Sequence, residues 1–227
     1  MGTLIERFEA FIKTQRGFEN IDELLRQRHI EGKRRADYLA WDRRVIVEQK
    51  VLVMDPADKP QRFVDDLIKQ RGILIYGRVS MEHVLARLPD GKELKRKFIR
   101  GLTKGVEDSF AAADRQTRDT REIFSIPDAV GIVVVLNASA PTLHLDLVRY
   151  GLSQMLQKRT ENGGIRYPNN DGLILISEAH TEASERGGAS PCFASPTPHT
   201  RSEETVREFS TALVKAWADF NKVPLLR

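Results

Sequence analysis

The sequence predicts an α/β fold in which a mixed central β-sheet is flanked by helices. Segments with helical periodicity alternate along the chain with short segments rich in β-branched residues, an order typical of α/β proteins. Residues 130–137 read VGIVVVLN, and so unbroken an apolar run fits a strand buried on both faces. The 227 residues contain no internal repeat and no linker-like stretch, so we expect a single domain over residues 1–227.

Apolar residues at helical spacing mark the helices. The first is expected at 3–15, where Leu4, Phe8 and Phe11 fall on one side, and the last at 202–221, where Phe209 and Trp217 do so. The helices between them are expected at 20–28, 60–71 and 145–158. Residues 79–122 also read as mostly helical, and we interpret them as a helical insertion in the α/β core.

Alternating and β-branched segments mark the strands. Residues 36–53 read as a β-hairpin, and further strands are expected at 73–76, 130–137 and 173–177. Residues 180–201 are rich in Gly, Ser, Thr and Pro, so we expect a long loop there.

Composition excludes several classes of protein. With 41% hydrophobic and 30% charged residues, the chain is neither collagen-like nor a disordered tail. Cys192 is the single cysteine, which leaves no internal disulfide and no cysteine-based zinc cluster. No apolar run is long enough to cross a bilayer, and Glu6 and Glu9 interrupt the segment where a signal peptide would be apolar. We therefore expect a cytoplasmic protein without a membrane partner.

Two common kinds of site are also disfavoured. The five histidines show none of the spacings of a zinc site, and no glycine-rich phosphate-binding motif is present. The net charge of +4 is modest, but basic residues cluster, as in the run at 33–35 and in the stretch 92–104. Such clusters attract phosphates if they share a face, and are otherwise an ordinary solvated surface.

The hairpin carries the residues of greatest chemical interest. If Asp42 and Arg43 form a two-residue turn, Asp37 lies directly opposite Glu48, and opposed residues point to the same face of a sheet. Lys50, two residues further on, joins that face. Two carboxylates this close repel each other unless a cation lies between them, and hard oxygen ligands suit Mg²⁺ or Mn²⁺.

The acid-x-Lys pattern is common, and its context singles out one copy. It occurs four times, and three copies lie in turn-like sequence or on a helix with ample exposed positions. Only Glu48 and Lys50 lie within a strongly apolar strand, where two charged residues need a reason to be present. The structural alternative is an exposed strand edge that carries a solvated ion pair.

At these residues the sequence resembles the PD-(D/E)XK, or restriction-endonuclease-like, nuclease superfamily. Its hallmark is an aspartate that starts one strand of a hairpin and an E-x-K triplet on the next strand, which Asp37, Glu48 and Lys50 match. The proline of the motif is Ala36 in this chain. Nucleases of this group often carry an Ala-x-x-Gln element on a later helix, and Ala-Asp-Arg-Gln ending at Gln116 resembles it.

The resemblance implies a restriction-endonuclease-like core and a metal-dependent nuclease that hydrolyses phosphodiester bonds, with DNA expected rather than RNA. Asp37, Glu48 and the backbone carbonyl of Gln49 would hold Mg²⁺ (or Mn²⁺), and Glu23 is our candidate for a third carboxylate. Lys50 would orient or activate a water, and Gln116 would lie near the metal or the scissile phosphate.

Further expectations concern the partners of the chain. The candidates to bind the nucleic-acid backbone are basic residues in or near the hairpin and one on the later helix: Lys33, Arg34, Arg35, Arg44 and Lys97. Such nucleases are often homodimers because two strands need cutting, although no residue here requires one.

Two other functions remain open at the level of sequence. The first is a non-catalytic nucleic-acid-binding or interaction module on the same fold. The second is a nuclease that senses a small nucleotide, for which no second ligand domain is evident.

Overall fold

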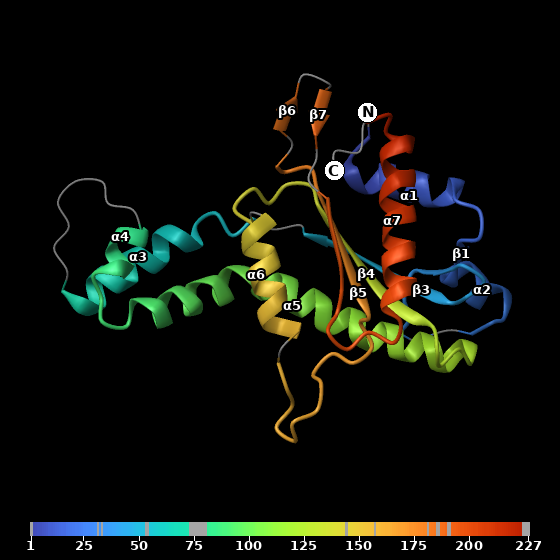
Figure 1. The fold of residues 1–227 in the computed structure, drawn as a ribbon, viewed down its shortest axis with the longest axis horizontal. Helices are drawn as coiled ribbons and strands as arrows, with labels where there is room; N and C mark the ends of the chain where they lie inside the picture. The colour runs from blue at the N-terminus through green and yellow to red at the C-terminus, as the bar shows by residue number, and fades with distance from the viewer. Residues whose placement is uncertain are drawn as a thin grey trace.

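A six-stranded mixed β-sheet forms the centre of the molecule (Figure 1). The computed structural model describes residues 2–30, 32, 34–52, 55–72, 81–143, 145–156, 158–180, 182–184, 187–189 and 192–223. In spatial order the strands are β1 (Glu19–Asn20), β2 (Tyr38–Ala40), β3 (Val45–Leu52), β4 (Val130–Asn137), β5 (Gly172–Ser177) and β8 (Cys192–Pro196). The three central strands β3, β4 and β5 run parallel, and the flanking pairs are antiparallel. The predicted α/β class with a mixed sheet is therefore correct.

Helices cover both faces of the sheet (Figure 1). One face packs against α1 (Leu4–Thr14) and α7 (Glu203–Phe220), whose aromatic side chains lie in the largest apolar cluster. The other face packs against α5 (Gly91–Phe124) and α6 (Leu145–Leu156). The buried apolar residues of β4 alternate between the two faces, which explains why the run at 130–137 has no polar side.

A short helix, α2 (Ile21–Gln27), closes the end of the sheet near the hairpin. Its N-terminus is capped by the side chain of Asn20, which accepts a hydrogen bond from the backbone N–H of Glu23 at 3.0 Å. Its apolar residues Ile21 and Leu25 pack in a cluster of their own with Leu39.

Three helical segments extend sideways from the sheet, and we call them the arm (Figure 1). The arm consists of α3 (Lys59–Arg71), α4 (Met81–Ala86) and the first half of α5, and it has a small apolar cluster of its own. The predicted insertion at 79–122 must therefore be corrected. From Val106 onward α5 packs on the sheet as a core helix, and the projecting part begins earlier, with α3.

The composition of residues 180–201 predicts a long loop, and this prediction is wrong. These residues contain the paired strands β6 (Glu182–Ser184) and β7 (Gly187–Ala189), and β8 then joins the main sheet by pairing with β5. Strand β8 is a short edge strand that ends at a proline, so its sequence lacks the unbroken apolar run that marks β4 and β5. The strand expected at 73–76 lies outside the described residues. Among the described residues, no helix is long and apolar enough to cross a membrane.

A buried ion pair fixes the second half of α5 to the sheet. Arg121 contacts Asp171 at 2.7 Å, and the same carboxylate accepts a hydrogen bond from the backbone N–H of Gly131. Arg121 also donates to the backbone carbonyl of Ala129 at 2.8 Å. Because breaking a buried pair costs about 3–5 kcal/mol, this contact holds α5 firmly at the start of β4 and β5.

Candidate active site on the central hairpin

The turn of the hairpin has the conformation that the sequence predicts. Asp42 and Arg43 both have positive φ angles, 53° and 63°, which a two-residue type I′ turn requires. The backbone N–H of Arg44 donates to the carbonyl of Trp41 at 3.1 Å and closes the turn.

The register of the hairpin is also as predicted. Tyr38 pairs with Val47, so continuing the register brings Asp37 opposite Glu48. Asp37 stands just before β2, and its backbone N–H donates to the carbonyl of Val47 at 3.2 Å. Glu48 and Lys50 lie on the face of β3 that is covered by α5.

The carboxylate of Asp37 is held by the backbone of the opposite strand. Its Oδ2 atom accepts a hydrogen bond from the backbone N–H of Gln49 at 2.7 Å. Burial raises the pKa of Asp37, while that hydrogen bond and the charge of Lys50 act in the opposite direction. Asp22 and Glu9 are close enough for their negative charges to raise this pKa further.

Glu48 is the most unusual residue of the site, because it is a carboxylate with an exposure of only 1%. Its Oε1 atom forms an ion pair with Nζ of Lys50, and its Oε2 atom is buried with no hydrogen-bond partner. Burial, and then the nearby charge of Asp37, raise the pKa of Glu48 to about 8, although Lys50 and Gln116 lower it. A buried, unpartnered carboxylate oxygen is costly and is the atom that a cation would satisfy.

Gln116 on α5 joins this site from 66 residues away. Its Oε1 atom accepts a hydrogen bond from Nζ of Lys50 at 2.7 Å, and its Nε2 atom donates to the backbone carbonyl of Arg35 at 2.8 Å. One turn earlier, the fully buried Ala113 allows α5 to lie close to the sheet. The side chain of Gln116 therefore fixes Lys50 in place and ties three separate segments together.

The structure thus brings together Asp37, Glu48, Lys50 and Gln116, the four residues for which a catalytic role is predicted. The backbone of Gln49 lies among them. Its side chain points to the opposite face of β3, where its Oε1 atom is buried without a partner, a feature that sequence reasoning did not anticipate. The alternative of an exposed strand edge with a solvated ion pair does not hold for Glu48, because its exposure is only 1%.

The third carboxylate remains a prediction. Glu23 lies on the exposed first turn of α2. Within the described part of the chain, no group of three or more His, Cys, Asp or Glu side chains is arranged to hold a metal ion. The two acidic residues that act on Asp37 through their charge are Asp22, which pairs with Arg35, and Glu9 on α1. Asp22 had no distinguishing signal in the sequence.

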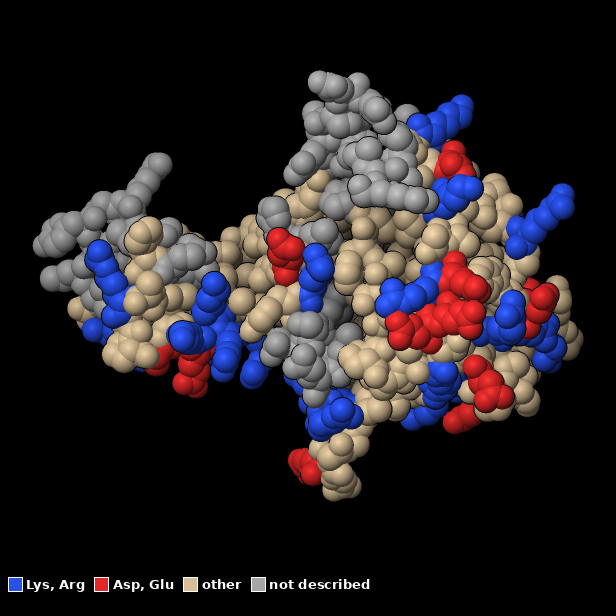
Figure 2. All heavy atoms as spheres, viewed as in Figure 1, with Lys and Arg blue, Asp and Glu red and all other residues tan. Residues whose placement is uncertain are grey.

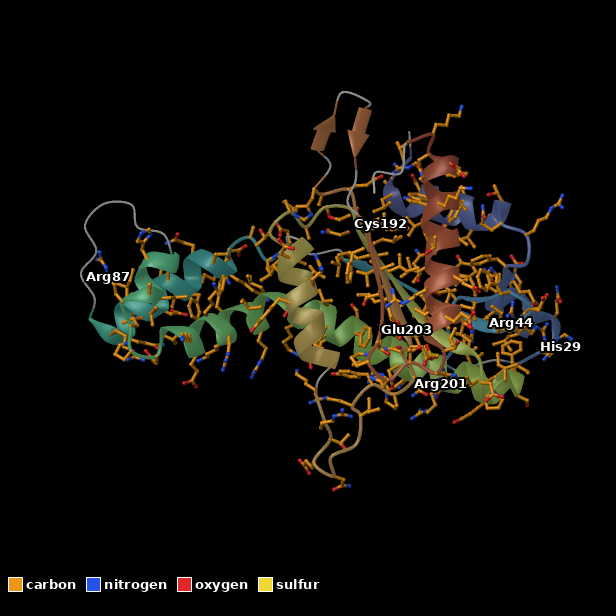
Figure 3. The ribbon with its side chains drawn as sticks, viewed as in Figure 1. His29, Arg44, Arg87, Cys192, Arg201 and Glu203 are labelled. Carbon is orange, nitrogen blue, oxygen red and sulfur yellow. The ribbon has the colours of Figure 1, made fainter. Side chains whose placement is uncertain are left out.

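The predicted backbone-binding residues fall in different places. Arg34 is exposed and lines a surface hollow with Asp119 and Glu122 of α5. The side chain of Arg35 donates to Asp22 at 2.5 Å. Arg44 lies over the ring of Trp41 at the turn, at the same end of the molecule as His29 (Figure 3). Lys97 is exposed on the arm, and Lys33 lies outside the described residues.

No protein-family model, no curated protein and no solved structure matches the chain. Function is therefore inferred from the residues and geometry of the site.

Proposed function

We propose that this chain is a metal-dependent nuclease of the PD-(D/E)XK superfamily that hydrolyses phosphodiester bonds, with DNA as the expected substrate. The observation that carries the proposal is the unpartnered Oε2 atom of Glu48, buried on a central strand near Asp37 and beside Lys50. A restriction-endonuclease-like core is part of the proposal. It is supported by the order of a hairpin, the helix that carries Gln116, and a strand parallel to β3.

The donor set fits a hard divalent cation. Asp37 and Glu48 would hold Mg²⁺ or Mn²⁺ through their carboxylates, and the resemblance adds the backbone carbonyl of Gln49 and the side chain of Glu23. The cation would polarise the scissile phosphate and lower the pKa of a water.

Lys50 would orient or activate the attacking water. Its ammonium is held by Glu48 and Gln116, so it is oriented before any substrate arrives. A fixed positive charge beside the phosphate would stabilise the negative charge that develops in the transition state. Arg34, Arg35 and Arg44 would contact the nucleic-acid backbone without reading its sequence.

Cleavage assays test the proposal directly. Supercoiled plasmid, linear single-stranded DNA and RNA are incubated with the wild type and with Lys50→Ala, in Mg²⁺, in Mn²⁺ and in EDTA. The expected result is cleavage that needs the cation and falls by at least about a hundredfold in the variant. Lys215→Ala, an exposed lysine of α7 on the opposite face of the sheet, is the matched control and should cut like the wild type.

The same assay distinguishes the non-catalytic alternative. If the wild type cuts none of the three substrates with either cation and yet binds one of them, the proposal of a nuclease is wrong. The chain would then be a nucleic-acid-binding module, and Glu48→Gln would not weaken its binding.

A further inference from the structure

The arm carries a dense cluster of positive charge. Between residues 92 and 104 of α5, six side chains are basic and one is acidic. All six basic side chains are exposed, and we call them the arm ridge: Lys92, Lys95, Arg96, Lys97, Arg100 and Lys104. Figure 2 shows Lys and Arg side chains gathered over this half of α5.

Most of these charges are not neutralised by neighbours. Within the part of the chain that the structure describes, Lys104 pairs with Asp108 at 3.1 Å, and none of the other five takes part in an ion pair. Uncompensated like charges on one helix repel each other, so the arm ridge is an unfavourable arrangement for the free protein. Negative charge from a partner would relieve that repulsion.

The chemistry of the arm surface indicates phosphate rather than bases or lipid. The aromatic rings of Phe63 and Phe98 pack against each other inside the arm, with their centroids 5.0 Å apart. No other aromatic residue lies in α3, α4 or the arm half of α5. Base stacking and membrane insertion both need exposed aromatic or apolar side chains, and the described arm surface offers charge instead.

The arm ridge and Gln116 of the candidate active site lie along one continuous helix, α5. Lys97, Arg100 and Lys104 are spaced by three and four residues and so share a side of the helix. Arg115 lies three further turns along on the same outer side of α5, is exposed, and directly precedes Gln116 in the sequence. The rise of an α-helix places Arg115 about 27 Å from Lys97, which is the length of about 8 base pairs of duplex DNA.

We propose that the arm ridge binds the phosphate backbone of the same DNA duplex whose phosphodiester bond is cut at the hairpin. This inference rests on the proposed nuclease function and adds a substrate preference to it. The favoured substrate is a duplex that extends at least about 8 base pairs from the cut site, because a shorter duplex would not reach Lys97.

A charge-removal variant tests binding without any need for cleavage. The arm variant is Lys95→Gln, Lys97→Gln and Arg100→Gln, and the matched control is Lys13→Gln, Lys215→Gln and Lys222→Gln on the α1 and α7 side. Binding of each to a labelled duplex of about 30 base pairs is measured by fluorescence anisotropy in EDTA over a range of salt concentrations. The arm variant should bind at least about tenfold more weakly, and its slope of log affinity against log salt should be shallower by about 3. The control should keep the slope of the wild type.

Two further measurements separate the outcomes. Phosphatidylserine vesicles are tested in parallel, and circular dichroism melting verifies that each variant is folded. An unchanged salt slope in the folded arm variant, or loss of vesicle binding with DNA binding intact, would overturn the inference.

Cleavage then separates this inference from the proposed function. The arm variant should lose at least about tenfold in kcat/KM on the long duplex. It should lose nothing on a duplex of about 5 base pairs closed by a loop, which is too short to reach Arg100. Equal cleavage of both lengths at the rate of the wild type would overturn the role of the arm and leave the nuclease intact. If the wild type binds the duplex through the arm but cleaves neither length, the role of the arm stands and the proposed nuclease function is wrong.

Discussion

Glu48→Gln should make the metal-free protein more stable at alkaline pH. The pKa of Glu48 in the folded protein is raised from its ordinary 4.5 to about 8, chiefly by burial. Below pH 4.5 the folded and the unfolded chain both hold the proton, so the raised pKa of Glu48 does not change the free energy of unfolding there. Between the two values the unfolded chain releases the proton while the folded chain keeps it, so the free energy of unfolding falls as pH rises, and the full loss is reached above pH 8.

The size of the effect follows from the same two values. At about 1.4 kcal/mol for each pH unit between them, the loss amounts to about 5 kcal/mol well above pH 8 and about 1 kcal/mol at pH 5. Glutamine has the shape of the protonated acid and does not titrate. The free energy of unfolding of Glu48→Gln relative to the wild type should therefore increase by about 4 kcal/mol between pH 5 and pH 9.

Urea unfolding followed by circular dichroism in EDTA at several pH values measures this difference. Other titrating groups are common to both proteins, so the difference isolates Glu48 together with its neighbour Asp37. If the free energies of unfolding of the two proteins change with pH in parallel, within about 1 kcal/mol, Glu48 is not a buried, costly carboxylate. Adding Mg²⁺ at pH 8 should raise the melting temperature of the wild type and leave that of Glu48→Gln unchanged.

Other predictions concern the neighbours of this carboxylate and the packing of the sheet. Gln116→Leu removes the acceptor for Lys50 and leaves the partly buried carbonyl of Arg35 without its donor. Urea unfolding should therefore show a loss of about 1–3 kcal/mol, and kcat should fall more than KM rises. Asp37→Asn keeps an acceptor for the backbone N–H of Gln49 but removes a carboxylate. Calorimetry should show that Mg²⁺ binding is lost while the stability of the metal-free protein does not fall. Retained Mg²⁺ binding would contradict this prediction. Gly131→Ala would place a Cβ atom 2.2 Å from a backbone oxygen, and overpacking of this kind should lower the free energy of unfolding by about 1–3 kcal/mol, seen as a lower melting temperature.

Local signals were sufficient to predict the hairpin. Its register depends on a two-residue turn and on the alternation of side chains along β3, and both are written in neighbouring residues. Once the turn at Asp42 and Arg43 is set, the positions of Asp37, Glu48 and Lys50 on one face follow from strand geometry alone. The predicted α/β class is equally local, because it depends on the order of periodic segments.

Tertiary contacts decided what the sequence could not predict. The bond from Gln116 to the carbonyl of Arg35 depends on how closely α5 approaches the sheet, which no local pattern encodes. The division of α5 between the arm and the core had no break in helical periodicity to mark it. Strand β8 formed in a segment whose composition is typical of a loop, because pairing with β5 supplies its hydrogen bonds.

The burial of Glu48 gives the strongest physical reason to look for chemistry at this site. An apolar residue could fill a buried position of this strand without the cost of burying a carboxylate, as Val45 and Val47 do on β3. Replacing a buried ion pair with apolar residues is often neutral or stabilising, so folding alone does not account for a glutamate and a lysine here. The ion pair with Lys50 satisfies one carboxylate oxygen and leaves the other buried without a partner. A ligand that carries positive charge would turn this cost into binding energy, which is why metal affinity and alkaline stability should change together when Glu48 is replaced.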